Sequence, residues 1–324
     1  MSRKWKGFWR ILWAVLALPV LLVPVLIRMA WAARGEVPEF RPVGADGAAT
    51  VRLLGEDGDT EEHNLEDYLV GVVLGEIPAD FEAEALKAQA VAARTYTRKA
   101  MATGGKHGKG FLCRDAACCQ AYWDPADFLD RGGSRESLEA VQSAVRETDD
   151  QVLTYDGELI EATFFSCSGG RTEDAVAVWG TDYPYLRATD SPGEEEARYF
   201  RDSRAFPRQE LEAALGVALP QDPDTWLGET TYTSGGGVDT WTIAGKVFTG
   251  VEVRKRLGLR SSAFTATVEG DGLTFETRGY GHRVGLSQYG AQAMARAGKD
   301  YVEILSHYYP GTEMVKYVEK FINE

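Results

Sequence analysis

The chain has 324 residues, of which 44% are hydrophobic and 26% charged, and this describes a globular protein with room for one large domain or two small ones. Its formal net charge of −14 argues against a nucleic-acid partner and against tight docking on anionic lipid, because both need clustered Lys and Arg. A neutral or cationic partner is the simpler expectation, and an uncharged glycan qualifies.

The amino-terminal segment predicts a single-pass transmembrane helix. Basic residues open the chain, namely Arg3, Lys4, Lys6 and Arg10. They precede an apolar stretch over 11–27, near the roughly 17–20 residues that a spanning helix needs, and this order places everything after the span outside the cytoplasm. Ala30-Trp31-Ala32 resembles a small-residue cleavage site, which leaves a cleaved signal peptide open as the alternative. We predict an anchor over 1–33, a linker over 34–50 and a folded domain over 51–324.

Periodicity and turn residues beyond the linker predict an α+β domain, because helices and strands do not alternate regularly. A helix is expected at 65–74, with Asn64 as its N-cap. Further helices are expected at 81–102, 134–147, 207–215, 251–257, 285–297 and 301–308. Strands are expected at 51–54, in a hairpin of 151–155 with 159–165 around Asp156-Gly157, and in several segments between 229 and 278.

Glu76 stands between an apolar helix and the turn at Pro78. Burial against Val72, Val73 or Ile77 raises a carboxyl pKa, as a general acid at neutral pH requires. The alternative is an exposed glutamate in a loop.

The next helix carries a few long polar residues among many alanines. Lys87 and Arg94 are seven residues apart and therefore share one helix face. Gln89 and Tyr96 are further long polar side chains on the same helix. Alanine occupies positions 85, 88, 90, 92 and 93, so we expect close packing on more than one side. The alternative is that Lys87 and Arg94 are simply solvated.

His107, Cys113 and Cys119 offer the imidazole and thiolate ligands that zinc prefers, and Cys118, a water or a substrate oxygen could complete the set. A disulfide is the competing interpretation, because an exported chain with four cysteines permits three pairings, Cys167 included. The spacing leaves both open.

Two glycine-rich segments allow close backbone approach to a ligand. The first, Phe-Phe-Ser-Cys-Ser-Gly-Gly over 164–170, contains Ser166 but no nucleophile elbow. The second, over 279–291, contains His282, Ser287 and Gln288 and feeds a helix, but it is not a phosphate-binding loop. A lone His is more often structural than catalytic.

Together these segments resemble the stage II sporulation protein D family over roughly 51–318. The resemblance rests on Tyr68 through Glu76 and Pro78, on Glu-Ala-Leu-Lys-Ala-Gln-Ala-Val-Ala-Ala-Arg-Thr-Tyr over 84–96, and on His107, Cys113 and Cys-Gln-Ala-Tyr over 119–122. It rests also on Ser-Cys-Ser-Gly-Gly over 166–170 and on Gly-Leu-Ser-Gln-Tyr-Gly-Ala over 285–291. One departure is Arg283, where the family commonly has glycine, and a long cation there is expected to narrow the cleft or contact substrate.

The resemblance implies a lytic transglycosylase that cleaves peptidoglycan glycan strands, stripped of their peptides, during engulfment of the forespore. It implies a site between the mother-cell and forespore membranes, with stage II sporulation proteins P and M as partners. Glu76 is the implied catalytic residue, Lys87 and Arg94 support it, and His107, Cys113 and Cys119 are the implied zinc ligands. We predict the substrate-binding residues to be Lys87, Gln89, Arg94, Tyr96, Ser166, His282, Ser287 and Gln288.

A single carboxylate suffices for this chemistry if the 6-hydroxyl of the sugar is the nucleophile, whereas glycoside hydrolysis usually needs two carboxylates. The main alternative is a non-catalytic, wall-binding enhancer of a cell-wall amidase, since the family is similar to such proteins. A zinc hydrolase is a third interpretation and requires an open metal position beside a base.

Overall fold

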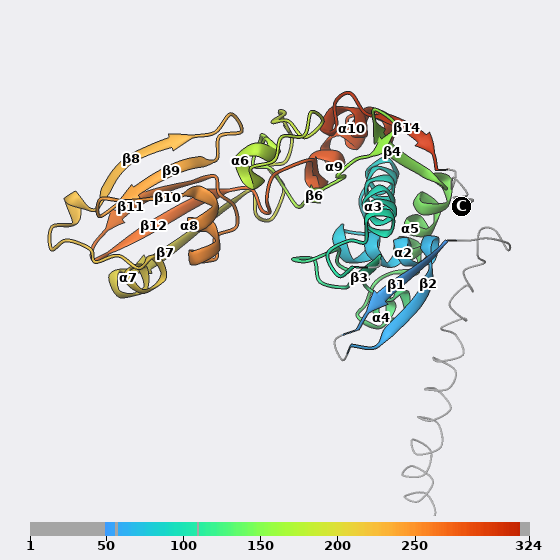
Figure 1. The fold of residues 1–324 in the computed structure, drawn as a ribbon, viewed down its shortest axis with the longest axis horizontal. Coiled ribbons are helices and arrows are strands. Elements are labelled where there is room, and N and C mark those ends of the chain that lie inside the picture. Colours follow the sequence, from blue (N-terminus) through green and yellow to red (C-terminus); the bar gives the residue numbers. More distant parts are fainter. Residues whose placement is uncertain (1–48, 56–57, 109, 318–324) are drawn as a thin grey trace, which may run out of the picture. The chain divides into compact units, whose positions relative to one another are not determined.

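The computed structural model describes residues 49–55, 58–108 and 110–317, all of which belong to one compact unit, 42–324. Helices and strands are mixed within it, as predicted (Figure 1). The helices are α2 (Leu65–Glu76), α3 (Ala83–Thr103), α4 (Pro125–Asp130), α5 (Arg135–Glu147), α6 (Ala175–Trp179), α7 (Arg208–Leu215), α8 (Gly250–Leu257), α9 (Gln288–Arg296) and α10 (Tyr301–Tyr308).

The strands form small sheets, most of them antiparallel. One has the order β2-β1-β3, formed by Thr60–Asn64, Thr50–Leu54 and Phe111–Cys113, and another has the order β14-β4-β5, formed by Glu313–Lys316, Gln151–Tyr155 and Glu158–Leu159. A short parallel pair joins β13 (Leu286–Ser287) to β6 (Phe164–Phe165). Two further sheets have the orders β10-β9-β8, formed by Lys246–Thr249, Val238–Ile243 and Leu227–Tyr232, and β11-β12-β7, formed by Phe264–Glu269, Gly272–Arg278 and Arg201–Pro207.

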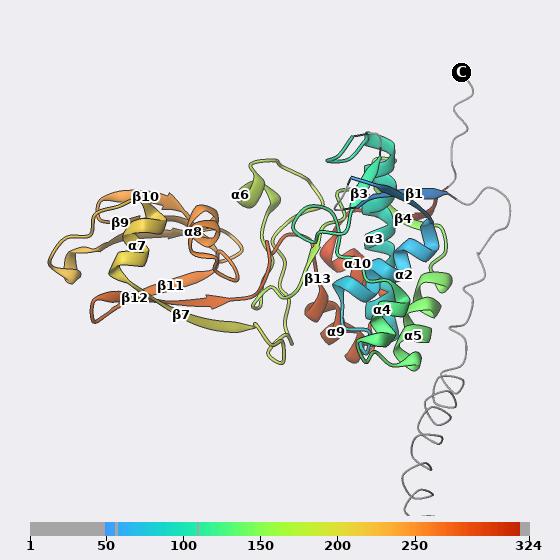
Figure 2. The same cartoon turned by 90° about the horizontal axis from the view of Figure 1, so that it is seen from below.

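Helix α3 is the centre of the first hydrophobic core. Its alanines at 85, 88, 90, 92 and 93 are fully buried, and α2, α5, α9, α10 and β4 all pack on it (Figure 2). Small side chains let neighbouring elements approach a helix closely on several sides, so the predicted close packing is confirmed. Gly104 ends the helix in the left-handed conformation, with φ of 90°.

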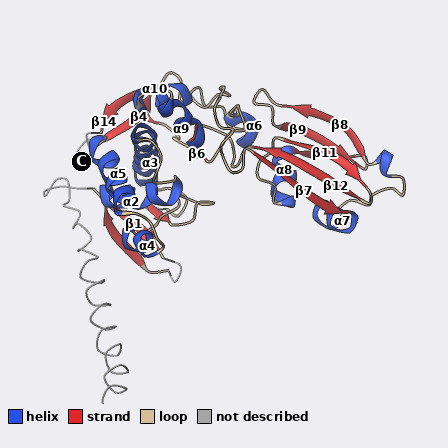
Figure 3. Cartoon of the chain, turned by 180° about the vertical axis from the view of Figure 1, so that it is seen from behind, coloured by secondary structure: helices blue, strands red, loops and turns tan. Residues whose placement is uncertain are grey.

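A second core lies wholly between residues 206 and 275. Aromatic rings meet edge to face in it, with the centroids of Phe206 and Phe275 5.6 Å apart and those of Trp241 and Phe264 5.9 Å apart. Figure 3 shows strands β7 to β12 gathered around this core with α7 and α8 beside them. This β-rich segment therefore has a core of its own.

Several predicted elements are confirmed, and two are corrected. Asn64 caps α2 as expected, accepting a hydrogen bond from the backbone N of Glu66 at 2.9 Å. The predicted strand over 159–165 is wrong as one element, because only β5 pairs with β4, while β6 pairs with β13. The helix predicted from 285 begins at Gln288, since Gly285 has φ of 83° and Ser287 is the N-cap.

The prediction of a single-pass transmembrane helix requires correction. Of the helices in the described ranges, none has both the length and the apolar character needed to cross a membrane. The longest, α3, carries charged residues at 84, 87, 94, 98 and 99. Residues 1–33, where the anchor was predicted, lie outside the described residues, so the structure does not support a spanning helix. The predicted boundaries of anchor, linker and domain stay a prediction.

Candidate active site

Glu76 is the last residue of α2, and its side chain is half-buried. Its Oε1 accepts a hydrogen bond of 2.5 Å from the backbone N of Ala121, and the side chain of Gln288 also bonds to it. Gln288 is the first residue of α9, so the structure brings together two predicted site residues that are 212 positions apart in the sequence. The carboxyl group is thereby held from both sides.

Two glycines on α2 make the contact with Ala121 possible. A Cβ at Gly75 would lie 2.9 Å from the backbone N of Tyr122, and a Cβ at Gly71 would lie 2.2 Å from the Tyr122 ring. The backbone N of Trp123 also donates to the carbonyl of Gly71 at 3.0 Å. Because Gly71 and Gly75 are four residues apart, they share one helix face, and that face forms a groove for the 121–123 segment.

The pKa of Glu76 is about 7, well above the ordinary value of 4.5. Burial raises it, because a charged carboxylate is poorly solvated there. The hydrogen bonds from Ala121 and Gln288 favour the charged form and moderate the rise. A carboxyl group with this pKa is populated in both protonation states near neutral pH. A group that must donate a proton and later accept one needs both states to be accessible.

Glu194, a fully buried carboxylate, fixes the loops around Gln288. Its Oε2 accepts from the backbone N and the Oγ of Ser168 at 2.8 and 2.7 Å and from the backbone N of Gly169 at 2.9 Å. Its Oε1 accepts from the hydroxyls of Ser191 and Ser287. Since Ser287 is the N-cap of α9, one buried carboxylate links the glycine-rich turn to the start of the helix that presents Gln288.

The structure places Arg94 in the core. The guanidinium is fully buried and makes two hydrogen bonds to Glu66, from Nε to Oε1 at 3.0 Å and from Nη2 to Oε2 at 2.6 Å. It also donates to the carbonyls of Val145 and Gln151 and to the hydroxyl of Thr148. These contacts join α2, α3 and the end of α5, and leave no guanidinium surface facing solvent.

Lys87 and Gln89 lie on the same helix in different surroundings. Lys87 Nζ is 2.8 Å from carboxylate oxygens of both Glu84 and Glu147, and the bond to Glu147 is the main reason that its pKa is raised. Gln89 is fully buried, and both polar atoms of its amide lack a hydrogen-bond partner within the described part of the chain. Such an unsatisfied amide is uncommon in a native core and leaves hydrogen-bonding capacity for a water or ligand.

The remaining predicted residues lie around these two regions. The Ser166 carbonyl accepts from the backbone N of Tyr289, beside Gln288, whereas Ser287 is fully engaged as a cap. His282 packs its ring against Phe165 and Trp179, with centroids 5.4 and 5.2 Å away. Burial, with a smaller contribution from the charge of Arg254, lowers the pKa of His282 to about 4, so the ring is neutral at pH 7.

The cysteine cluster contains four candidate metal ligands. The ligand atoms of His107, Cys113, Cys118 and Cys119 all lie within 4.8 Å of one another, and the four cysteines of the chain are free thiols. Cys118 therefore joins the three residues predicted from the sequence. Three thiolates and an imidazole are a donor set that suits zinc, and four protein ligands would complete a tetrahedral site. Tyr96 lies beside this cluster, and its pKa is raised by burial and then by the Cys119 thiol.

Comparison with known proteins places these features in a family. The family model described as "Stage II sporulation protein" matches residues 56–155. The stage II sporulation protein D of Bacillus subtilis (strain 168) is 39% identical over 265 residues, covering 80% of this chain and 76% of the relative, and that of Bacillus amyloliquefaciens is 40% identical over 254 residues, covering 77% and 74%.

The chain belongs to the stage II sporulation protein D family. Its role accordingly lies in sporulation. A more distant relative, named "Amidase enhancer" in Bacillus subtilis (strain 168), is 29% identical over 308 residues, covering 77% of this chain and 40% of the relative.

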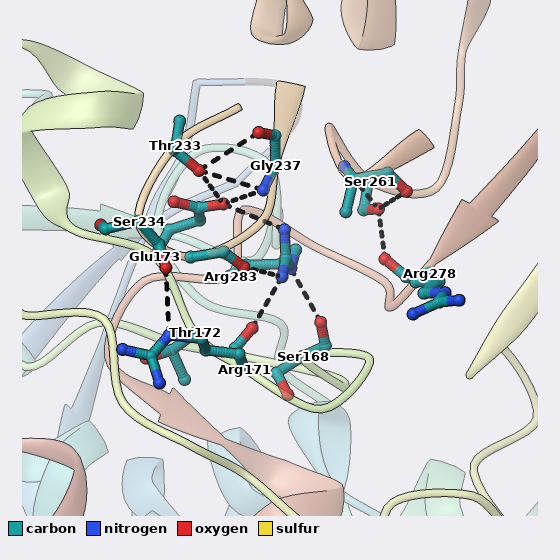
Figure 4. A network of polar contacts seen from close by, with 12 residues as sticks. Ser168, Arg171, Thr172, Glu173, Thr233, Ser234, Gly237, Ser261, Arg278 and Arg283 are labelled. Carbon is teal, nitrogen blue, oxygen red and sulfur yellow. Dashed lines mark hydrogen bonds and ion pairs between the residues drawn. The ribbon is translucent and has the colours of Figure 1, made fainter. Parts of the chain in front are cut away.

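Arg283 does not line a cleft in this family member. Its side chain is only 3% exposed, and its Nη1 lies 3.1 Å from Glu173 Oε1. The guanidinium also donates to the carbonyls of Ser168, Arg171 and Gly235. Figure 4 shows it at the centre of a polar network that reaches the turn at 233–237. The prediction that Arg283 narrows the cleft is therefore corrected, because its side chain forms a buried ion pair with Glu173.

The backbone at position 283 also accounts for a preference for glycine there. Arg283 has φ of 66°, a left-handed conformation that favours glycine over residues with a side chain. The ion pair with Glu173 and three carbonyl contacts offset that strain in this chain.

The sequence interpretation did not include several residues that shape the site. Gly71 and Gly75, Ala121 and Glu194 were not singled out. The four-residue spacing of the glycines just before Glu76 was a readable signal of a close approach to the helix. Ala121 lies within the Cys-Gln-Ala-Tyr motif, but nothing in the sequence indicates its contact with Glu76, and no pattern marks Glu194, because both roles arise from contacts between segments far apart in the chain.

Proposed function

We propose that the chain is a lytic transglycosylase that cleaves peptide-free glycan strands of peptidoglycan during forespore engulfment, with Glu76 as its catalytic residue. The observation that carries the proposal is a half-buried carboxyl group with pKa of about 7, oriented by Ala121 and Gln288. Glycoside hydrolases usually place a second carboxylate opposite the first. A single group that alternates between acid and base suits a reaction in which the substrate supplies the nucleophile.

The reaction balances with one carboxyl group. Protonated Glu76 donates its proton to the glycosidic oxygen between muramic acid and the next glucosamine, and the bond from C1 to that oxygen breaks. The leaving sugar departs with the proton as a free hydroxyl group. The Glu76 carboxylate then takes the proton of the muramic acid 6-hydroxyl, whose oxygen bonds to C1 and closes a 1,6-anhydro ring. Glu76 ends protonated, and no water is consumed.

The hydrogen bonds at Glu76 support both halves of this cycle. Burial raises the pKa, so a substantial fraction of Glu76 is protonated at neutral pH. The Ala121 N–H stabilises the carboxylate that forms after proton donation. The unsatisfied amide of Gln89 is a candidate group for hydrogen bonding to a bound sugar. The other proposed substrate-binding residues are Lys87, Tyr96, Ser166, His282, Ser287 and Gln288. Ser287 also caps α9, and Arg94 lies in the core, where it pairs with Glu66.

Zinc is the proposed metal of the cysteine cluster, held by His107, Cys113 and Cys119 with Cys118 as the fourth ligand. When bound, zinc would supply a structural cross-link between β3 and the loop that leads to Ala121. Four protein ligands leave no open position for a metal-bound water, which argues against a zinc hydrolase. Stage II sporulation proteins P and M are the proposed partners, and the space between the two membranes is the proposed site of action.

Mass spectrometry of the products tests the proposal. The full chain and its Glu76→Gln variant are incubated with purified peptide-free glycan strands. We expect fragments that end in anhydro-muramic acid, lighter by one water than hydrolytic products, from the unsubstituted chain alone. Ordinary reducing ends would mean hydrolysis, and full activity of the variant would contradict the role of Glu76.

An amidase enhancer is the second candidate function, and the likeness to the relative of that name favours it. Intact strands after incubation, together with a faster reaction of an added cell-wall amidase, would support this alternative. The half-buried carboxyl group with pKa near 7 favours the enzyme, because a binding protein has no need of it.

A further inference from the structure

A cavity of about 580 Å³ lies in the β-rich segment, on strands that contain none of the predicted site residues. Its volume falls within the range of typical small-ligand sites. It is lined by Arg201, Asp202, Ser203, Tyr232, Gly236, Ala263, Phe264, Thr265, Glu276, Thr277 and Arg278. The side chains combine two cations, two carboxylates, hydroxyl groups and two aromatic rings.

Arg201 and Arg278 stand directly opposite each other on the paired strands β7 and β12. Both are exposed, and neither guanidinium has a hydrogen bond or ion pair with any residue in the described ranges. Like charges directly opposite each other on paired strands destabilise a sheet. A bound anion would relieve that repulsion, since a guanidinium fork matches a carboxylate geometrically.

The backbone around Arg278 is fixed. Its N donates to the carbonyl of Ala263 at 2.8 Å, and its carbonyl accepts from Ser261 Oγ. Figure 4 shows this carbonyl contact, with the guanidinium turned away from it. The backbone that carries this cation is therefore anchored, and its exposed side chain is left to contact a ligand.

The remaining lining fits a saccharide. The Tyr232 side chain is 57% exposed and offers an aromatic face to the apolar face of a sugar ring. Ser203, Thr265 and Glu276 are exposed and can bond to hydroxyl groups. Asp202 is paired with Arg260 at 3.7 Å. Counting partners among the described residues alone, the lining keeps two unpaired cations and one unpaired carboxylate, Glu276.

We propose that this cavity is a second glycan-binding site, separate from Glu76, which takes a sugar that carries a carboxylate. The inference rests on the proposed function. A peptide-free glycan strand carries a lactyl carboxylate on each muramic acid, so the charge and the sugar ring are present in one ligand. Binding here would hold a strand independently of its cleavage.

Binding measurements test the inference on the full chain carrying Glu76→Gln, which keeps the strands intact. The double substitution Arg201→Gln with Arg278→Gln is expected to weaken binding of peptide-free strands by about tenfold or more. Tyr232→Ala is expected to weaken it as well. Arg146→Gln with Lys255→Gln, which removes two exposed cations elsewhere, is the matched control and should change nothing.

Two comparisons identify the ligand. Chitin oligosaccharides have the same type of sugar backbone without lactyl groups, so they are expected to bind more weakly and to be insensitive to the double substitution. Free stem peptides should not compete. Unchanged strand binding in the double variant, or competition by stem peptides as strong as by strands, would overturn the assignment.

Two further readouts separate binding from folding and from catalysis. The double variant should unfold at the same or a higher temperature, because it loses a repulsion, so weaker binding cannot come from unfolding. Hydroxyl-radical footprinting should show Tyr232 protected by strands in the Glu76→Gln chain but not in the chain that also carries the double substitution. Failure of these tests leaves the anhydro-product test of Glu76 untouched, and failure of that test leaves these binding results standing.

Discussion

A carboxylic acid that is half-buried at the end of a helix affects stability as well as proton transfer. The pKa of Glu76 is about 7 in the folded chain and near 4.5 in the unfolded one. As pH rises from 4.5 to 7, the unfolded chain loses this proton first, so the folded state loses stability relative to acidic pH and stays lower above pH 7.

Glu76→Gln should therefore gain stability over the unsubstituted chain as pH rises through this window. We expect a gain of about 1–2 kcal/mol at pH 8, less than the full pKa shift would give, because the group is partly solvated. Urea unfolding at pH 4, 6 and 8 measures it. A difference that does not vary with pH would contradict the raised pKa.

The same pKa predicts how cleavage depends on pH. If protonated Glu76 donates the first proton, the rate should fall as pH rises above about 7, because the acid form is lost. A pH–rate profile on peptide-free strands checks this. A rate that stays flat to pH 9 would exclude Glu76 as the acid.

Arg94 offers a test that separates a core role from a substrate role. Arg94→Met leaves the Glu66 carboxylate buried without its partner and should cost about 3–5 kcal/mol of unfolding free energy. Adding Glu66→Leu removes the unpaired charge and should restore most of that stability. Urea unfolding and a turnover assay of the double variant decide the matter. A double variant that folds normally but has lost turnover would assign Arg94 to the substrate.

At the scale of elements, the glycine face of α2 controls the environment of Glu76. Gly75→Ala should push the 121–122 backbone away, because the new Cβ would lie 2.9 Å from it. Loss of the Ala121 hydrogen bond raises the pKa of Glu76 further, so the alkaline fall of the rate should move to higher pH while the maximal rate drops about tenfold or more. The pH–rate profile of this variant, with circular dichroism to confirm the helix, is the measurement. An unshifted profile would mean that Ala121 does not tune Glu76.

The last candidate zinc ligand, Cys119, lies two residues before Ala121 in the chain. Removing metal with a chelator should lower the unfolding temperature by several degrees, since a structural zinc site contributes directly to folding. Metal analysis of the purified chain and of Cys118→Ser checks the ligand set. Bound zinc that is unaffected by Cys118→Ser would leave three protein ligands and an open position.

Local sequence signals predicted the elements whose residue periodicity and capping residues are enough to identify them. The helix predicted at 65–74, which the structure extends to Glu76, and the alanine-rich α3 were readable in this way. Short pieces such as β6 and β13 were not, because each is two residues long and exists only through pairing with the other. The same holds within the site. Glu76 could be read from an apolar helix before a proline, but its neighbours Ala121 and Gln288 come from distant segments and depend on tertiary packing.

At the scale of the whole molecule, the β-rich segment is linked to the rest of the domain by a buried ion pair and hydrogen bonds in addition to the covalent chain. The Glu173 carboxylate accepts hydrogen bonds from Arg283, from the Thr233 hydroxyl and from the backbone N of Gly237. The turn at 233–237 is thereby tied to segments on either side of the β-rich insertion.

Arg283→Gly tests the balance between this pair and the backbone. Glycine relieves the left-handed strain, worth about 1 kcal/mol, but leaves Glu173 buried without its cation, which costs about 3–5 kcal/mol. We expect a net loss of about 2–4 kcal/mol by urea unfolding, and Arg283→Gly with Glu173→Gln should recover part of it. A single variant as stable as the unsubstituted chain would mean that the ion pair contributes nothing.

The meeting of Glu76 with Gln288 also has a consequence for biosynthesis. Folding rates fall when contacts join distant parts of a chain, and here the carboxyl group acquires its Gln288 hydrogen bond only after the segment around 288 has been synthesised and packed on α3. A growing polypeptide that ends before that segment lacks half of the arrangement around its acid. The arrangement around Glu76 can therefore be completed only after synthesis of the segment that contains Gln288.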